Sequence, residues 1–125
     1  MTIIDGKIVK LGTLAQYVLD RRIPLEMCLS SNVHTGSVAT MQDHPFRLYF
    51  DRGFRVTINT DDRLMSNTSM TKEFQIAVDE FGLTLGDLEK LTINAIKSAF
   101  IPFDDRLRLI YKVIKPGYAK IRDGA

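Results

Sequence analysis

The sequence FRVTINTDD, residues 54–62, decides the fold. Every second residue from Phe54 to Ile58 is apolar and the residues between them are polar, a pattern typical of a β-strand with one buried face. The apolar face should pack against helices, and the polar face should include Asp61 if the extended path continues that far. Two adjacent carboxylates, Asp61 and Asp62, thus follow directly after the strand, where their negative charges repel each other.

The rest of the chain has the patterns of five helices and one further strand. A strand is expected at about residues 25–28, and a polar loop over about 30–36. Helices are expected at about residues 11–21, 43–53, 74–81, 84–95 and 107–114, the last of them disturbed by Pro116-Gly117. The order α–β–α–β–α–α–α contains no internal linker, which predicts a single unit over residues 1–125.

Strands that alternate with helices predict an α/β fold with parallel strand pairing. Two parallel strands need further strands beside them and cover on both faces, and a complete (β/α)8 barrel takes about 250 residues. With 125 residues and two strands, the chain is therefore expected to be part of a larger unit. In such a barrel the polar face of residues 54–58 points inward, and the strand ends carry the active site.

Composition excludes several classes of function. The chain is 45% hydrophobic and 26% charged, and 17 basic against 15 acidic residues leave a net charge of +2. A charge this balanced does not by itself indicate a nucleic-acid partner. The basic residues near the C-terminus also argue against one, because no aromatic residues interleave with them in a stacking pattern. No apolar run is long enough to span a membrane. The single Cys28 excludes an intramolecular disulfide, so a reducing cytoplasm is the expected compartment.

The Asp61-Asp62 pair has two interpretations. Aspartate is favoured at a helix N-terminus, and taken alone the pair is better interpreted as a helix-capping loop. In the functional interpretation, one carboxylate binds a metal cation while the other accepts a hydrogen bond from a substrate.

Three other residues with reactive side chains, His34, His44 and Cys28, favour structural roles. The two histidines lie in expected loops without a spacing that suggests joint metal binding, and His44 beside Pro45 suits the start of a helix. Cys28 has no nearby histidine to activate its thiol, which favours a small buried residue over a nucleophile. The chain has neither a Gly-rich phosphate loop nor a nucleophile elbow.

Read together, three stretches resemble the C-terminal portion of the adenosine deaminase family, the zinc-dependent purine nucleoside aminohydrolases. They are PLEMCLSSNVHTG at residues 24–36, HPFRLYFDRGFRVTINTDDRLMSNTSM at 44–70 and LTINAIKSAFIPFDDRLRLI at 91–110. The INTDD motif after a strand is the family's own. The resemblance runs from about Leu11 to Pro116, nearly the whole chain.

The resemblance implies a fold, an activity and roles for individual residues. The implied fold is α/β, the C-terminal portion of a (β/α)8 TIM barrel. This chain would supply two strands, the seventh and eighth, plus the closing helices, and is incomplete as a barrel. Asp61 would be a zinc ligand that also orients the attacking hydroxide, and Asp62 would accept or share a hydrogen bond with the purine nitrogen N7. Ser31 would lie near the pocket in a minor role. The activity would be hydrolytic deamination of adenosine or deoxyadenosine to inosine or deoxyinosine.

The same resemblance implies that other parts of the site lie elsewhere. The family takes three zinc-binding histidines, a glutamate acid and a histidine base from strands that this chain does not contain, so the 125 residues alone are expected to be inactive. An alternative is a non-catalytic half-barrel that associates with a complementary N-terminal chain or with itself. A third possibility is a related deaminase acting on adenine or another purine.

Overall fold

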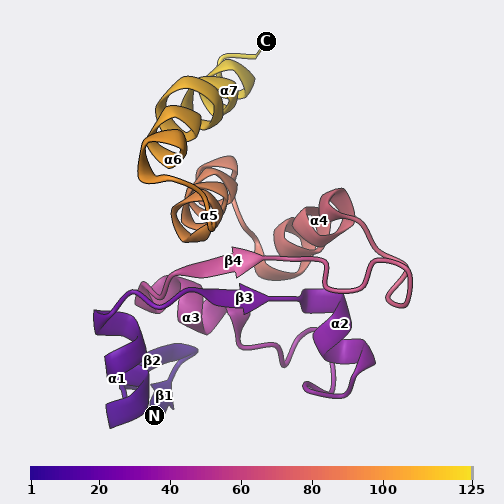
Figure 1. Cartoon of the computed structure of the whole chain (residues 1–125). Helices are drawn as coiled ribbons and strands as arrows, with labels where there is room; N and C mark the ends of the chain where they lie inside the picture. The colour runs from indigo at the N-terminus through magenta and orange to yellow at the C-terminus, as the bar shows by residue number, and fades with distance from the viewer. Residues whose placement is uncertain (125) are drawn as a thin grey trace.

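A computed structural model describes residues 1–124 of the chain. It contains two separate two-stranded sheets surrounded by helices (Figure 1). In chain order the elements are β1 (Thr2–Ile4), β2 (Lys7–Lys10), α1 (Thr13–Asp20), β3 (Leu25–Met27), α2 (Leu29–His34), α3 (Phe46–Arg52), β4 (Val56–Ile58), α4 (Met70–Phe81), α5 (Leu85–Ser98), α6 (Phe103–Leu109), the π-helical segment η1 (Ile110–Ile114) and α7 (Lys115–Arg122).

Strands β3 and β4 form the parallel pair that the alternation of strands and helices predicts. Leu25 lies opposite Val56, and Met27 lies opposite Ile58. Both strands point toward α2 and toward the loop that leads into α4, so the segments after the two strands meet at one edge of the sheet (Figure 1). The α/β class is confirmed, and the described residues form two short sheets without a closed barrel.

The apolar face of residues 54–58 is the centre of the core, as the alternation predicts. Phe54, Val56 and Ile58 are only 3%, 0% and 3% exposed, and they pack with Leu29 and Phe46 from α2 and α3. Full burial of side chains of this size stabilises the fold by roughly 1.5–3 kcal/mol each, before side-chain entropy is subtracted. The core therefore fixes β4 against the helices and leaves its polar face for other contacts.

The expected loop over residues 30–36 is wrong in part, because most of it forms α2. Leu29 is fully buried in the first turn of this helix, and Ser30 and Ser31 are buried behind it. The backbone N–H of Ser30 donates to the buried carboxylate of Glu73 on α4, 3.3 Å away. Polar residues thus adopt helix here because tertiary partners satisfy them, which local composition does not reveal.

The hairpin of β1 and β2 is absent from the sequence expectations. Its turn is Asp5-Gly6, and both residues have positive φ, 50° and 70°. An Asp-Gly pair between short alternating runs is the usual signal for a two-residue hairpin turn, since glycine adopts positive φ without a steric cost. Ile8 is the buried residue of this hairpin.

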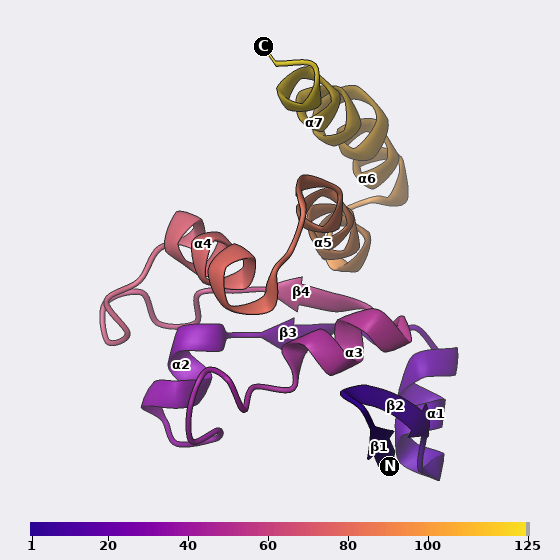
Figure 2. The ribbon, with the colours of Figure 1, turned by 180° about the vertical axis from the view of Figure 1, so that it is seen from behind.

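Pro116 and Gly117 do not end the last helix. They lie in the first turn of α7, which continues directly from α6 through η1. Proline is tolerated in a first helical turn, and the π-helical segment immediately before it changes the hydrogen-bond pattern at that point. The disturbance expected at Pro116 therefore takes the form of a local π-helix. The continuous helix runs away from the sheet toward the C-terminus, with α5 between the two (Figure 2).

Candidate functional site

Asp61 lies beyond the C-terminal end of β4, where it meets the segment that follows β3. Strand β4 ends at Ile58, and Asp61 has a left-handed backbone with φ of 54°. The extended path therefore stops before Asp61, contrary to the assumption made from the alternation. A bend directs this carboxylate instead, and a left-handed aspartate is among the less strained exceptions to the glycine preference.

The side chains of Asp61 and Ser31 contact each other. The Ser31 hydroxyl donates to Oδ2 of Asp61 over 2.7 Å. Ser31 is buried in α2, whereas Asp61 is exposed, so a fixed donor holds one oxygen of an accessible carboxylate. The other oxygen, Oδ1, has no hydrogen-bond partner among residues 1–124. The structure thus brings together two residues 30 positions apart that the sequence resemblance placed near one pocket.

Asp62 makes different contacts from its neighbour. Its Oδ1 accepts from the backbone N–H groups of Leu64 and Met65, at 3.0 and 3.1 Å. Asp62 thus caps a segment as expected, but the expected helix is wrong, because the capped segment is a turn over residues 63–67 and α4 has Ser69 as its N-cap. Oδ2 of Asp62 has no partner in the described part of the chain and stays available.

Glu73 organises the site, and the sequence analysis missed it. It is fully buried on α4, where Oε2 accepts from the backbone N–H of Ser30 and Oε1 accepts from the Thr68 hydroxyl at 2.7 Å. One carboxylate thus joins α2, next to Ser31, to the loop that follows Asp62. A signal existed, because Glu73 precedes the buried Ala77 by four residues and so lies on the same helix face.

Cys28, which follows β3 directly, is partly buried next to this site. Burial raises the pKa of its thiol, and the negative charges of Asp61, Glu26 and Glu73 raise that pKa further, against a lowering contact with the Asp61 backbone. The thiolate is the nucleophilic form of cysteine, and these surroundings disfavour it. The structural interpretation of Cys28 therefore agrees with its environment.

His44 is a buried structural residue at the start of α3. Its Nδ1 accepts from the backbone N–H of Phe46 at 3.1 Å, so Nε2 carries the proton and donates to Oδ1 of Asn32 at 2.9 Å. Burial lowers the pKa of His44, opposed by the charge of Glu73. The helix-start interpretation of His44 is confirmed, whereas His34 is exposed in the last turn of α2.

The pKa of His44 predicts how stability depends on pH. Because the folded pKa lies below the ordinary value of 6.5, the unfolded chain takes up a proton at higher pH than the folded chain. The stabilising contribution is fully present above that value and is lost as the pH falls below it toward the folded pKa. Urea unfolding between about pH 7.5 and pH 5 should show this loss in the native chain and a smaller one in His44→Gln. If the free energy of unfolding falls equally with pH in the native chain and in His44→Gln, the prediction is contradicted.

The described residues offer one candidate metal ligand at this site. No group of three or more His, Cys, Asp or Glu side chains within residues 1–124 is arranged to hold a metal ion. Asp61 presents one carboxylate oxygen, whereas a catalytic zinc site takes about three protein ligands. The same residues contain no helix that is long and apolar enough to cross a membrane.

Sequence comparison connects the chain with a protein family. A family model described as adenosine deaminase matches residues 5–116. Adenosine deaminase 1 of Streptomyces coelicolor is 56% identical over 118 residues, which are 94% of this chain and 30% of that protein. The adenosine deaminase of Mycobacterium leprae is 58% identical over 111 residues, 89% of this chain and 31% of the relative. The chain thus spans about a third of the length of the curated relatives it matches, in their C-terminal part.

Solved structures show the same partial coverage. The adenine deaminase from Arthrobacter aurescens superposes with a TM-score of 0.79 at 24% identity, over 87% of this chain and 33% of its own. A structure described as the ADAL–IMP complex superposes with a TM-score of 0.77 at 24% identity, over 88% and 32%. At these identities the likeness concerns the fold. The expected portion of a TIM barrel is confirmed, since the chain has the fold of about a third of these barrels.

Proposed function

Because the chain belongs to the adenosine deaminase family, we propose that it supplies the Asp61 and Asp62 carboxylates to the active site of a zinc-dependent (β/α)8 barrel. The completed barrel hydrolyses adenosine or deoxyadenosine at the 6-amino group, giving inosine or deoxyinosine and ammonia. Residues 1–125 act as one unit of this barrel, in a reducing cytoplasm that suits the single Cys28.

One observation carries the proposal, the hydrogen bond from Ser31 to Asp61 where parallel β3 and β4 end. Active sites of (β/α)8 barrels lie at this end of the strands, because the loops after the strands converge there. An exposed carboxylate held by a buried hydroxyl is the arrangement by which a neighbouring residue orients a metal ligand.

Asp61 fits one position of a zinc site. Its Oδ2 is held by Ser31, which leaves Oδ1 to bind the metal together with ligands from other strands. Zinc bound there would lower the pKa of a coordinated water, so that hydroxide is available near neutral pH. The chain's own contribution is to hold the carboxylate: Ser31 fixes its rotamer, and the left-handed backbone of Asp61 aims it.

Asp62 performs a separate task. Its Oδ1 is engaged with the backbone of the turn at residues 63–67, which fixes the side chain in place. Oδ2 is then available to share a hydrogen bond with the purine nitrogen N7, in which one of the two atoms carries the proton. Two adjacent carboxylates thus act without competing, since each has one oxygen bound within the protein and one directed to a ligand.

A chimeric barrel tests the proposal. The matched third of Streptomyces coelicolor adenosine deaminase 1 is replaced by this chain, and adenosine, deoxyadenosine, adenine and AMP are each offered with zinc. We expect deamination of adenosine and deoxyadenosine, and no product from the isolated 125 residues. A folded, zinc-loaded chimera that is inactive on all four substrates would overturn the proposal, and activity on adenine or AMP alone would correct the substrate. Inosine formation by the isolated chain would contradict its expected inactivity.

A second candidate function, the non-catalytic half-barrel, is favoured by exposed apolar side chains. Phe100, Leu64 and Met65 are 107%, 87% and 80% exposed. Leu64 and Met65 are consecutive residues of the loop after β4, and exposed apolar side chains that lie together mark sites of association. The half-barrel would bind a complementary N-terminal chain or a second copy of itself, and sedimentation as a clean monomer would argue against self-association.

A further inference from the structure

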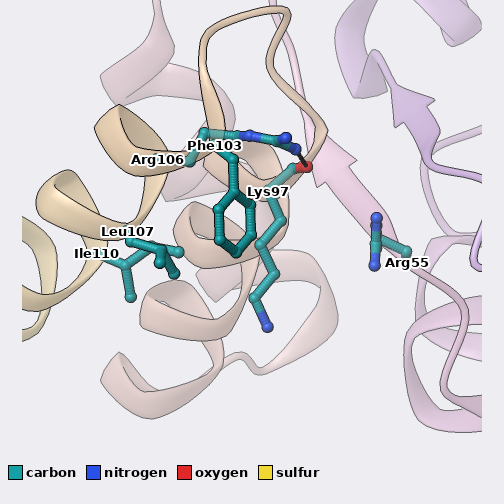
Figure 3. Close-up of a pocket in the computed structure, with 6 residues that line it drawn as sticks. All are labelled: Arg55, Lys97, Phe103, Arg106, Leu107 and Ile110. Atoms are coloured by element: carbon teal, nitrogen blue, oxygen red, sulfur yellow. Dashed lines mark hydrogen bonds between the residues drawn. The ribbon is translucent and has the colours of Figure 1, made fainter.

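A second cluster of functional groups lies at the other end of β4, away from Asp61. A cavity of about 370 Å³ is lined there by basic and apolar side chains (Figure 3). We call this the basic pocket; its residues are Arg55, Lys97, Phe103, Arg106, Leu107 and Ile110. Arg55 precedes β4, Lys97 lies on α5 and Arg106 on α6, so three segments bring their positive charges to one cavity.

The cations of the basic pocket lack anionic partners. The ion pairs within residues 1–124 involve Arg47, Arg108 and Arg122, and none includes Arg55, Lys97 or Arg106. The Nε atoms of Arg55 and Arg106 are buried without any acceptor. A buried donor without a partner destabilises a fold, so two of them on residues that line one pocket call for an explanation.

The surroundings concentrate positive potential on Arg55. Burial lowers its pKa, and the charges of Arg22 and Arg106 lower it further. The terminal nitrogen of Arg106 donates to the Lys97 carbonyl over 2.8 Å, and its guanidinium lies over the Phe103 ring (Figure 3). Neither contact neutralises charge. A carboxylate in this pocket would pair with these cations and relieve the repulsion between Arg55 and Arg106.

The basic pocket lies beside the free edge of β4. The Leu25 N–H donates to the Arg55 carbonyl, and the Asn59 N–H donates to the Met27 carbonyl. The odd-numbered residues of the segment 55–59 therefore form their backbone hydrogen bonds toward β3. In a parallel ladder the peptide groups of Val56 and Ile58 therefore point to the opposite edge. On that edge the Asn94 side-chain amide donates a hydrogen bond to the Val56 carbonyl. Lys97 follows Asn94 by three residues and so lies on the same side of α5.

We propose that the basic pocket seats an acidic side chain of the polypeptide segment whose strand pairs with the free edge of β4. The inference rests on the proposed function, since a completed barrel requires that strand. The relatives contain about two thirds of a chain beyond the matched part, enough to supply such a segment. A second copy of this chain fits less well, because it would bring the same cations into a symmetric contact.

Co-expression tests the proposal. This chain is produced with the unmatched portion of the Streptomyces coelicolor relative, and the dissociation constant of the purified complex is measured by sedimentation at graded salt concentration. Arg55→Gln/Arg106→Gln is expected to weaken the complex roughly tenfold or more and to reduce its salt dependence. The control Lys112→Gln/Lys120→Gln removes the same charge from exposed positions and should leave the complex nearly unchanged.

Further variants separate a lost ion pair from a folding defect. Arg55→Lys/Arg106→Lys keeps both charges and should restore most of the affinity, and circular dichroism verifies that each variant is folded. Replacement of one acidic residue of the partner segment should weaken the complex by the same factor. In combination with Arg55→Gln/Arg106→Gln it should weaken the complex no further. Equal effects of pocket and control variants would overturn the proposal. The proposal would also be overturned if the pocket binds inorganic phosphate while the affinity of the complex does not depend on Arg55. It would likewise be overturned if this chain alone forms a dimer and the pocket variants dissociate that dimer. Deaminase activity is not read out, so the binding result stands apart from the proposed reaction.

Discussion

Replacing Asp61 by alanine in the chimeric barrel is expected to lower kcat/KM for adenosine by roughly 10³-fold or more, about 4 kcal/mol of transition-state stabilisation. The reason is that Asp61 is proposed to bind zinc through the oxygen that Ser31 leaves free. Loss of this ligand should also lower the zinc content of the purified protein. Steady-state kinetics and metal analysis of the same preparation measure both effects.

Two neighbouring variants control this experiment. Ser31→Ala removes the hydrogen-bond donor to Asp61 and should lower kcat/KM roughly 10- to 100-fold while most zinc is retained. This is the usual effect of losing a residue that orients a metal ligand. Asp62→Asn keeps an oxygen for the turn at residues 63–67 and should retain zinc while it weakens catalysis through the purine contact. An Asp61→Ala chimera with normal zinc content and near-normal rate would refute the assignment of Asp61.

The largest effect on stability is expected for Glu73→Ala, which should lower the free energy of unfolding by about 3 kcal/mol. Glu73 is fully buried and accepts hydrogen bonds from Ser30 and Thr68, so alanine would leave a cavity and a buried N–H without an acceptor. Urea unfolding measures the loss. The segments at residues 28–31 and 61–68 should also exchange amide hydrogen faster, because Glu73 joins them.

Two matched variants test the cause. Glu73→Gln keeps the shape and one carbonyl oxygen and should lose only about 1 kcal/mol. Asp79→Ala removes an exposed carboxylate from the same helix, where it accepts from Gln75, and should change stability by less than about 0.5 kcal/mol. If Glu73→Ala is no less stable than Asp79→Ala, the buried hydrogen bonds do not hold the site together.

Much of the candidate site follows from the sequence, because it depends on local chemistry. The alternation of residues 54–58 predicts the strand and its buried face, and the INTDD motif marks Asp61 and Asp62. The capping preference of aspartate also predicts that Asp62 accepts hydrogen bonds from backbone N–H groups just after it, although these belong to a turn and not to a helix. By contrast, the position of Glu73 on the helix face of Ala77 indicates burial, but no local pattern identifies Ser30 and Thr68 as its hydrogen-bond partners.

The sequence by itself determined the α/β class, the parallel strand pair, the family motif and the apolar face that forms the core. Each depends on residues close together in the chain, where periodicity and residue type act directly. The tertiary structure alone decided that residues 29–34 form a helix, that Ser31 reaches Asp61, and that Arg55 and Arg106 share a pocket. These features join segments 30 to 51 positions apart in the chain, and no local pattern encodes which distant residues meet. The helix and the Ser31–Asp61 contact are stabilised by buried polar groups that find specific partners, whereas the two arginines are brought together by the packing of α5 against β4 and of α6 against α5.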